Sequence, residues 1–98
     1  MVQKKFRLSA KVSSDNPPAI KPILDRIFEG KGTVIEVPQG FEIDAELEGE
    51  SAVALNRTLL SELRRAEKKT RMRSQWTSGN AIEKFFDYVL KATLNAKD

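Results

Sequence analysis

The sequence predicts a two-layer α+β sandwich in which helices cover one face of a β-sheet. The chain has 98 residues, of which 40% are apolar and 32% are charged, a composition typical of one globular domain. Four segments alternate apolar and polar residues, as half-buried strands do. Two segments repeat apolar residues every three or four positions, as helices do. We therefore expect a single domain that spans residues 1–98.

Residues 5–13 form the first predicted strand, because every second side chain is apolar. Residues 13–18, Ser-Ser-Asp-Asn-Pro-Pro, are turn formers that end this strand. A helix is expected from Ala19 to Gly30, since apolar residues recur at helical spacing and glycine commonly follows a last helical turn. The apolar sets are Phe6, Leu8, Ala10 and Val12 in the strand and Ile20, Ile23, Leu24, Ile27 and Phe28 in the helix.

Residues 33–37 and 41–47 are expected to form a β-hairpin. The connection at residues 38–40, Pro-Gln-Gly, fits a three-residue loop whose final glycine takes the left-handed conformation. A loop of this length sets Ile35 opposite Ile43, so that both side chains face the core.

A second helix is expected to follow Ser51, whose hydroxyl can accept a hydrogen bond from a free N–H group of the first turn. Residues 70–76 then alternate again and predict the fourth strand. The inward positions are Ala52, Leu55, Leu59, Leu63 and Ala66 in the helix and Met72, Ser74 and Trp76 in the strand.

The segment at residues 80–94 fits two structures. Four of its apolar residues share one side of a helical wheel, and Asn80 with Glu83 resembles a capping box. Residues 85–89, Phe-Phe-Asp-Tyr-Val, are instead strand formers, and the preceding Ser-Gly-Asn could turn a hairpin. Strand alternation is poor across the segment, so we favour a helix and retain a strand as the alternative.

The predicted order, β-α-β-β-α-β plus a terminal element, is that of a ferredoxin-like sandwich. In that fold the first strand lies between the third and the fourth, and one face of the sheet is open. The open face of the first strand would carry cations, and that of the third strand would carry anions. Opposite charges would therefore meet across the two strands. The charges concerned are Lys5, Arg7 and Lys11, and Glu42, Asp44, Glu46 and Glu48.

The composition excludes most catalytic and metal-binding arrangements. The chain has neither cysteine nor histidine, so disulfides, thiolate or imidazole metal ligands, and Ser-His-Asp triads are ruled out. Acylphosphatase shares the predicted topology, but its phosphate loop needs an arginine and glycines, which residues 13–18 lack. The acidic row of the third strand faces cations that would repel a metal ion. We therefore expect a non-enzyme that has no metal or cofactor.

The longest uncharged apolar run, at residues 52–55, is far too short to cross a bilayer. The N-terminus has no apolar core of a signal peptide. We therefore expect a cytoplasmic protein that has no membrane contact.

A basic segment at residues 57–73 predicts the leading function, binding to the phosphate backbone of nucleic acid. Net charge over the whole chain is only +3, but residues 51–98 alone carry +5. Seven cations around one helix–strand junction could neutralise several phosphates. Glu62 and Glu67 lie within the segment, so a solvated helix face with salt bridges is the alternative. The seven cations are Arg57, Arg64, Arg65, Lys68, Lys69, Arg71 and Arg73.

Base stacking of the kind used by RNA-binding modules of the RRM type is not expected. Those modules project aromatic side chains from their first and third strands. Here the outward positions of both strands are polar or charged. We therefore expect contacts mainly to phosphates. The sequence does not indicate whether the nucleic acid is DNA or RNA.

A homodimeric interaction or regulatory domain is the alternative function. The apolar stripe of the C-terminal element cannot pack on the charged face of the sheet without burying charges. It could instead pair with a second copy of the chain, since most small oligomers are symmetric. The interface residues would be Ile82, Phe85, Phe86 and Val89.

Overall fold

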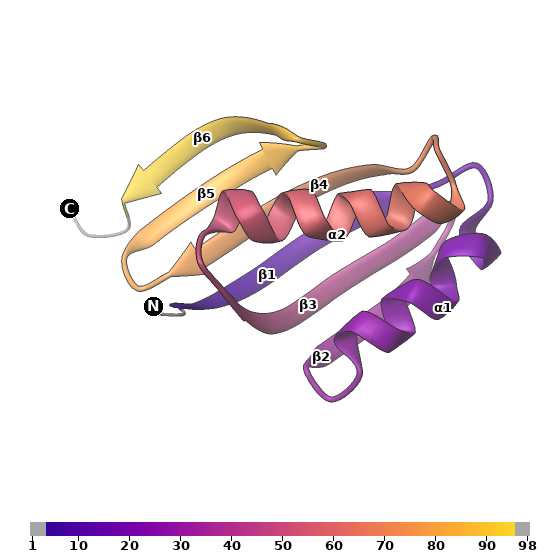
Figure 1. Ribbon diagram of the computed structural model, residues 1–98, viewed down its shortest axis with the longest axis horizontal. Coiled ribbons are helices and arrows are strands. Elements are labelled where there is room, and N and C mark those ends of the chain that lie inside the picture. Colours follow the sequence, from indigo (N-terminus) through magenta and orange to yellow (C-terminus); the bar gives the residue numbers. More distant parts are fainter. Residues whose placement is uncertain (1–3, 96–98) are drawn as a thin grey trace.

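Six antiparallel strands form one sheet in the order β2-β3-β1-β4-β5-β6, and two helices cover one of its faces (Figure 1). The computed structural model describes residues 4–95, so residues 1–3 and 96–98 of the predicted domain lie outside the described part. In chain order the elements are β1 (Lys4–Ser13), α1 (Pro17–Phe28), β2 (Gly32–Val37), β3 (Gly40–Gly49), α2 (Ala52–Ala66), β4 (Arg71–Ser78), β5 (Ala81–Phe86) and β6 (Val89–Asn95).

The predicted fold class, a ferredoxin-like βαββαβ sandwich with a C-terminal helix favoured, is wrong. The C-terminal segment forms a hairpin, β5 and β6, that pairs with β4 and extends the sheet to six strands. Asp87, with φ 56°, opens the turn of this hairpin. Lys91 has no partner on β5, because Lys84 pairs with Ala92 and Phe85 with Leu90. This bulge shifts the alternation of inward and outward side chains in β6 by one residue. The shift explains why the apolar residues at positions 80–94 do not alternate as those of a regular strand do.

β1 pairs with both β3 and β4. As predicted, opposite charges meet across β1 and β3, with Lys5 opposite Glu48 and Lys11 opposite Glu42. Arg7 also lies 3.1 Å from the carboxylate of Asp44. Both of those side chains are more than half exposed, so the pair contributes little to stability.

The predicted register of the β2–β3 hairpin is wrong by one residue. Gln39, with φ 69°, takes the left-handed conformation that we expected at Gly40, and Gly40 is itself the first residue of β3. The loop therefore has two residues. Val34 pairs with Ile43, and Ile35 faces the solvent opposite Glu42 with 56% of its surface exposed.

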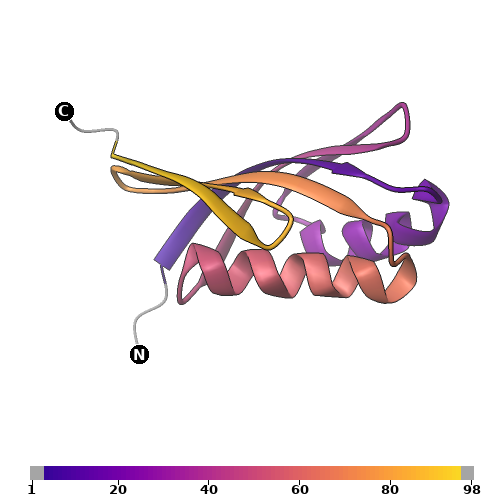
Figure 2. The same cartoon turned by 90° about the horizontal axis from the view of Figure 1, so that it is seen from above.

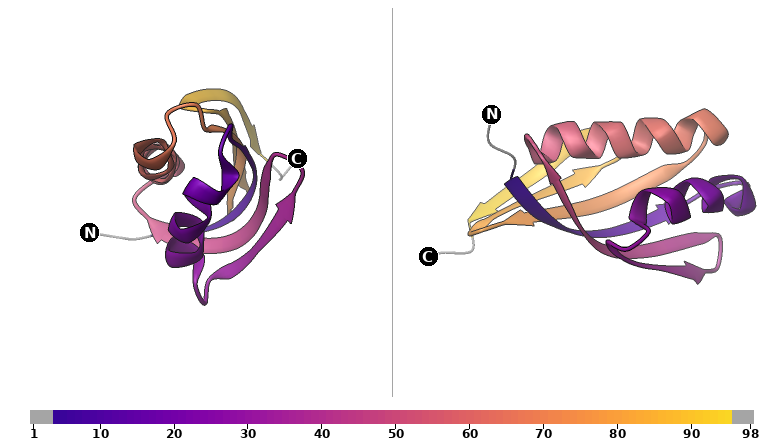
Figure 3. Two further views of the ribbon diagram at one scale, coloured as in Figure 1. Left: turned by 90° about the vertical axis from the view of Figure 1, so that its right-hand side faces the viewer. Right: turned by 60° about the horizontal axis from the view of Figure 1, so that its bottom comes forward.

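The core lies between the inner face of the sheet and the two helices, on one side of the sheet only (Figures 2 and 3). α1 begins at Pro17, earlier than expected, because proline tolerates the first helical positions. Ser51 caps α2 as predicted, and its hydroxyl accepts a hydrogen bond from Ala54 N at 3.1 Å. The largest buried side chains include Trp76, Phe28, Phe41, Leu8, Ile20 and Leu24. Within the described chain, no helix is both long enough and apolar enough to span a bilayer.

Candidate nucleic-acid interface

The face of the sheet opposite the helices is open, and one part of it is strongly basic. On this face Lys11 of β1, Arg73 of β4, Phe86 of β5 and Val89 of β6 form one cross-strand row. Further cations project from the same side of β4, β5 and β6. We call the following five residues the basic face: Lys11, Arg71, Arg73, Lys84 and Lys91.

Two shallow hollows adjoin on this face. The first, of about 430 Å³, is lined in part by Arg71, by the Pro38 end of the β2–β3 hairpin and, on its β3 side, by the acidic residue Glu42. The second, of about 490 Å³, is lined in part by Lys84 and Lys91. Both are open to solvent, and both include the same three residues: Lys11, Arg73 and Phe86. The two hollows therefore offer one continuous surface rather than two enclosed pockets.

Phe86 lies at the centre of the basic face and is half-buried. The guanidinium carbons of Arg71 and Arg73 lie 5.6 and 5.2 Å from the centre of its ring. At these distances the aromatic ring attracts both cations. The ring therefore holds two arginines side by side at the junction of the hollows.

Acidic residues limit the basic face on one side. β3 projects Glu42, Asp44, Glu46 and Glu48 from the open face, next to the cations of β1. The open face is therefore polarised, acidic along β3 and basic from β1 to β6. Within residues 4–95, no three Asp or Glu residues are grouped closely enough to hold a metal ion.

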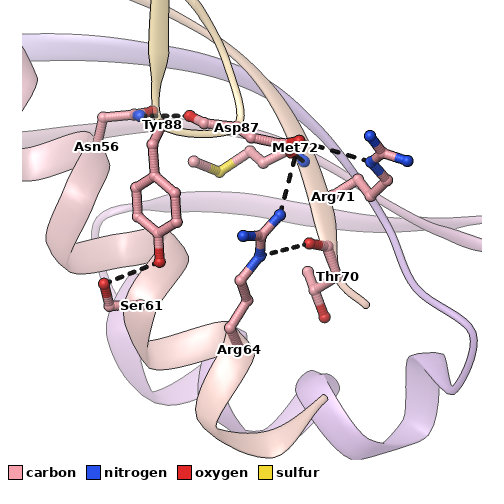
Figure 4. A network of polar contacts seen from close by, with 8 residues as sticks. All are labelled: Asn56, Ser61, Arg64, Thr70, Arg71, Met72, Asp87 and Tyr88. Atoms are coloured by element: carbon pink, nitrogen blue, oxygen red, sulfur yellow. Dashed lines mark hydrogen bonds and ion pairs between the residues drawn. The ribbon is translucent and has the colours of Figure 1, made fainter. Parts of the chain in front are cut away.

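Asp87, in the turn between β5 and β6, fixes two of the predicted phosphate-binding arginines (Figure 4). Its carboxylate lies 3.6 Å from Arg64 and 3.5 Å from Arg71, and it accepts a hydrogen bond from Met72 N at 2.9 Å. Arg64 also donates from Nε to the carbonyl oxygen of Thr70 at 2.9 Å. Arg64 is therefore engaged in holding the hairpin against β4 and α2.

Three more contacts fasten the same turn to α2. Asn56 Nδ2 donates to the carbonyl oxygen of Asp87 at 2.8 Å. The hydroxyl groups of Ser61 and Tyr88 share a hydrogen bond at 3.1 Å. The guanidinium of Arg64 lies 5.1 Å from the centre of the Tyr88 ring. The turn thus positions the β5–β6 hairpin, which carries two of the five basic-face cations and Phe86.

The structure does not bring the seven predicted cations together. Arg57 and Arg65 are exposed on α2, in the helical layer, and Lys68 and Lys69 lie in the loop between α2 and β4. Only Arg71 and Arg73 lie on the basic face. Three cations of the basic face were not predicted as phosphate contacts: Lys11, Lys84 and Lys91. The alternation of Ile82, Lys84 and Phe86 on β5 was the available signal for Lys84.

The four predicted dimer residues lie on two faces of the sheet. Phe85 faces the core, whereas the other three, Ile82, Phe86 and Val89, lie on the open face. Phe86 pairs there with Val89. Val89 lies on the edge strand β6 and is 56% exposed. These residues therefore do not form the single apolar stripe that a helix would have presented.

α1 carries an ion pair of its own, remote from the open face. Lys21 Nζ donates a hydrogen bond to Asp25 Oδ2 at 2.8 Å, one helical turn away. This hydrogen bond, together with the charge of Asp25, raises the pKa of Lys21. Lys21 therefore stays protonated over the range in which nucleic-acid binding would be measured.

No protein-family model, no curated protein and no solved structure matches this chain. Its function has to be inferred from the residues of the open face themselves.

Proposed function

We propose that this protein is a non-catalytic module that binds the phosphate backbone of a nucleic acid through the basic face. One observation carries the proposal: five cations from four neighbouring strands surround two continuous hollows on the uncovered side of the sheet. Of these five, only Arg71 makes an ion pair among the described residues, and its partner is Asp87. The other four can contact a ligand without breaking an ion pair.

The spread of the cations favours a polymer over a small anion. Neighbouring strands lie roughly 4.8 Å apart, so the cations from β1 to β6 extend over roughly 14 Å. A single phosphate group could contact only one or two of them. A chain of phosphates could neutralise all five, and the release of counterions would then drive binding.

The acidic row of β3 gives the interface a boundary. Glu42 and Asp44 would repel phosphates, so a nucleic acid is expected to lie over β1, β4, β5 and β6 and to avoid β3. Of the predicted segment, Arg71 and Arg73 belong to this interface, whereas the cations of α2 and of the loop after it lie outside the contact.

A titration with labelled single-stranded and duplex oligonucleotides at about 50 and 200 mM salt tests this proposal. Five phosphate contacts give a log–log salt slope of about −3.5 for a single strand and about −4.5 for a duplex. Affinity is then expected to fall roughly 100- to 500-fold between the two salt concentrations. A wild-type protein that binds neither oligonucleotide at low salt would overturn the proposal.

A pair of matched double variants locates the contact. R73Q/K84Q removes two charges from the basic face, and R57Q/R65Q removes two charges from exposed positions on α2. We expect the first variant to lose affinity and to reduce the salt slope by about 1.4 to 1.8, while the second binds as the wild type does. Equal losses in the two variants would show that net charge alone, and not this face, governs binding.

Self-association through the C-terminal element stays a second candidate function, because β6 is an edge strand. Such strands carry unpaired backbone groups that can pair with another chain. Val89 and Leu90 at its beginning are 56% and 44% exposed. Light scattering at tens of micromolar protein decides this candidate, and a monomer there would remove it.

A further inference from the structure

Phe86 occupies a position that the core does not require. Its neighbour Phe85 fills the core, whereas Phe86 projects to the opposite side, beside Arg73 on β4 and Val89 on β6. Among the outward positions of the described strands it is the single aromatic residue. A half-buried aromatic ring among cations, at the junction of both hollows, is suited to contact a planar ligand group with its accessible part.

We infer that the ligand of the basic face is a single-stranded nucleic acid, one base of which stacks on Phe86, while Arg71 and Arg73 beside the ring contact the backbone. The inference rests on the proposed function and narrows its substrate class. Single-strand binders combine a basic groove for the backbone with aromatic side chains that stack bases.

The position of Phe86 on the open face also favours a single strand over a duplex as the ligand. In a duplex the faces of the bases are covered by their neighbours, so Phe86 would meet only phosphates and sugars. In a single strand a base can turn out of the stack and lie on the ring. Lys84, two residues before Phe86 on β5, and Lys11, across β4 on β1, are then placed to contact phosphates beside that base.

Stacking of this kind predicts little sequence preference. Every base has a π-face, so a single aromatic platform accepts all of them. RRM-type modules carry their stacking residues on the first and third strands, whose outward positions are polar or charged in this chain. Here the aromatic residue comes from β5, a strand added at the other side of β4.

The test replaces the ring and leaves every charge in place. Phe86→Leu is expected to weaken binding to a single-stranded oligonucleotide about tenfold or more, with the salt slope and the duplex affinity unchanged. Ile82→Ala, on the same side of the same strand, is the matched control and is expected to bind normally. Thermal melting of each variant checks that the fold is retained.

A second variant keeps the experiment informative if Phe86→Leu disturbs the fold. Phe86→Trp should retain single-strand affinity, and the fluorescence of the new indole should be quenched when a base stacks on it. Trp76 is only 1% exposed, so its own emission forms a constant background. Absence of quenching in this variant would overturn the inference.

The remaining outcomes separate the inference from the proposed function. Equal weakening of single-strand and duplex binding by Phe86→Leu would overturn the stacking inference and leave phosphate binding by the basic face intact. No binding of the wild type to either form would remove both.

Discussion

Replacing Asn56 with alanine is expected to lower the free energy of unfolding by about 3 kcal/mol. Asn56 is 1% exposed on α2, and its side-chain hydrogen bonds all go to residues outside that helix. Its Oδ1 accepts hydrogen bonds from Ser74 Oγ and from Trp76 Nε1, and its Nδ2 donates to the carbonyl oxygen of Asp87. Removing the amide leaves several buried polar groups with fewer partners, and each costs about 1–3 kcal/mol when unpaired.

Urea denaturation of purified variants measures this effect. Arg57→Ala, at the next and exposed position of α2, is the control and should change stability by less than about 0.5 kcal/mol. Asn56→Ala should cost less in a protein that already carries Ser74→Ala, because the two side chains share a hydrogen bond. Purely additive losses in the double variant would contradict this account of the network.

Replacing Gly40 with alanine is expected to cost more than about 3 kcal/mol, which is enough to unfold a marginal domain. Gly40 begins β3 opposite Ser13 of β1. A Cβ atom at this position would overlap the carbonyl oxygen of Val12. That oxygen belongs to the backbone of the central strand and cannot move without separating β1 from β3.

Gly79→Ala supplies the matched comparison for this substitution. Gly79 has φ 59°, and apart from its two neighbours in the chain no other residue has an atom within 4 Å of the position that a Cβ would take. Its substitution therefore costs only the strain of the left-handed conformation, about 1–2 kcal/mol. Circular dichroism and urea denaturation compare the two variants. Similar stabilities for both would show that the β1–β3 pair can accept a methyl group at Gly40.

The parts of the fold that could be predicted from the sequence are those that local periodicity determines. The inward positions of β1 and β4 are buried as the alternation indicated, with Leu8 and Trp76 among the most buried side chains. Ser51 caps α2 because a cap involves only residues three positions apart. The expected pairing of β1 with β3 was taken from the assumed topology, and the opposite charges on the two strands agreed with it; both are found in the structure.

The errors arose where one residue changes the register of a strand. Nothing in the local pattern indicated that Gln39, and not Gly40, would take the left-handed conformation. The bulge at Lys91 disrupted the alternation of β6 in the same way. Because side chains alternate with a period of two, each single-residue shift moves a whole strand to the opposite face.

The candidate site was harder to predict than the fold because it depends on contacts between distant residues. Arg64 and Arg65 are adjacent arginines that the sequence does not distinguish. Of the two, only Arg64 forms an ion pair with Asp87, in the turn between β5 and β6. Lys11 and Lys84 come together only through the pairing of β1 with β4 and of β4 with β5. The sequence showed which segment is rich in cations, but it could not show which of these cations lie on the open face of the sheet.

The position of β1 in the sheet bears on the order in which we expect the strands to assemble. β1 comes first in the chain, yet in the sheet it separates β3 from β4. On one side of it β2 and β3 form a hairpin, and on the other β4, β5 and β6 follow one another as a meander. Both groups close through short connections, whereas β1 has to pair with strands that follow it at long range. We therefore expect β1 to join the sheet after the two local groups have formed, and its insertion to bring the acidic and basic halves of the open face together.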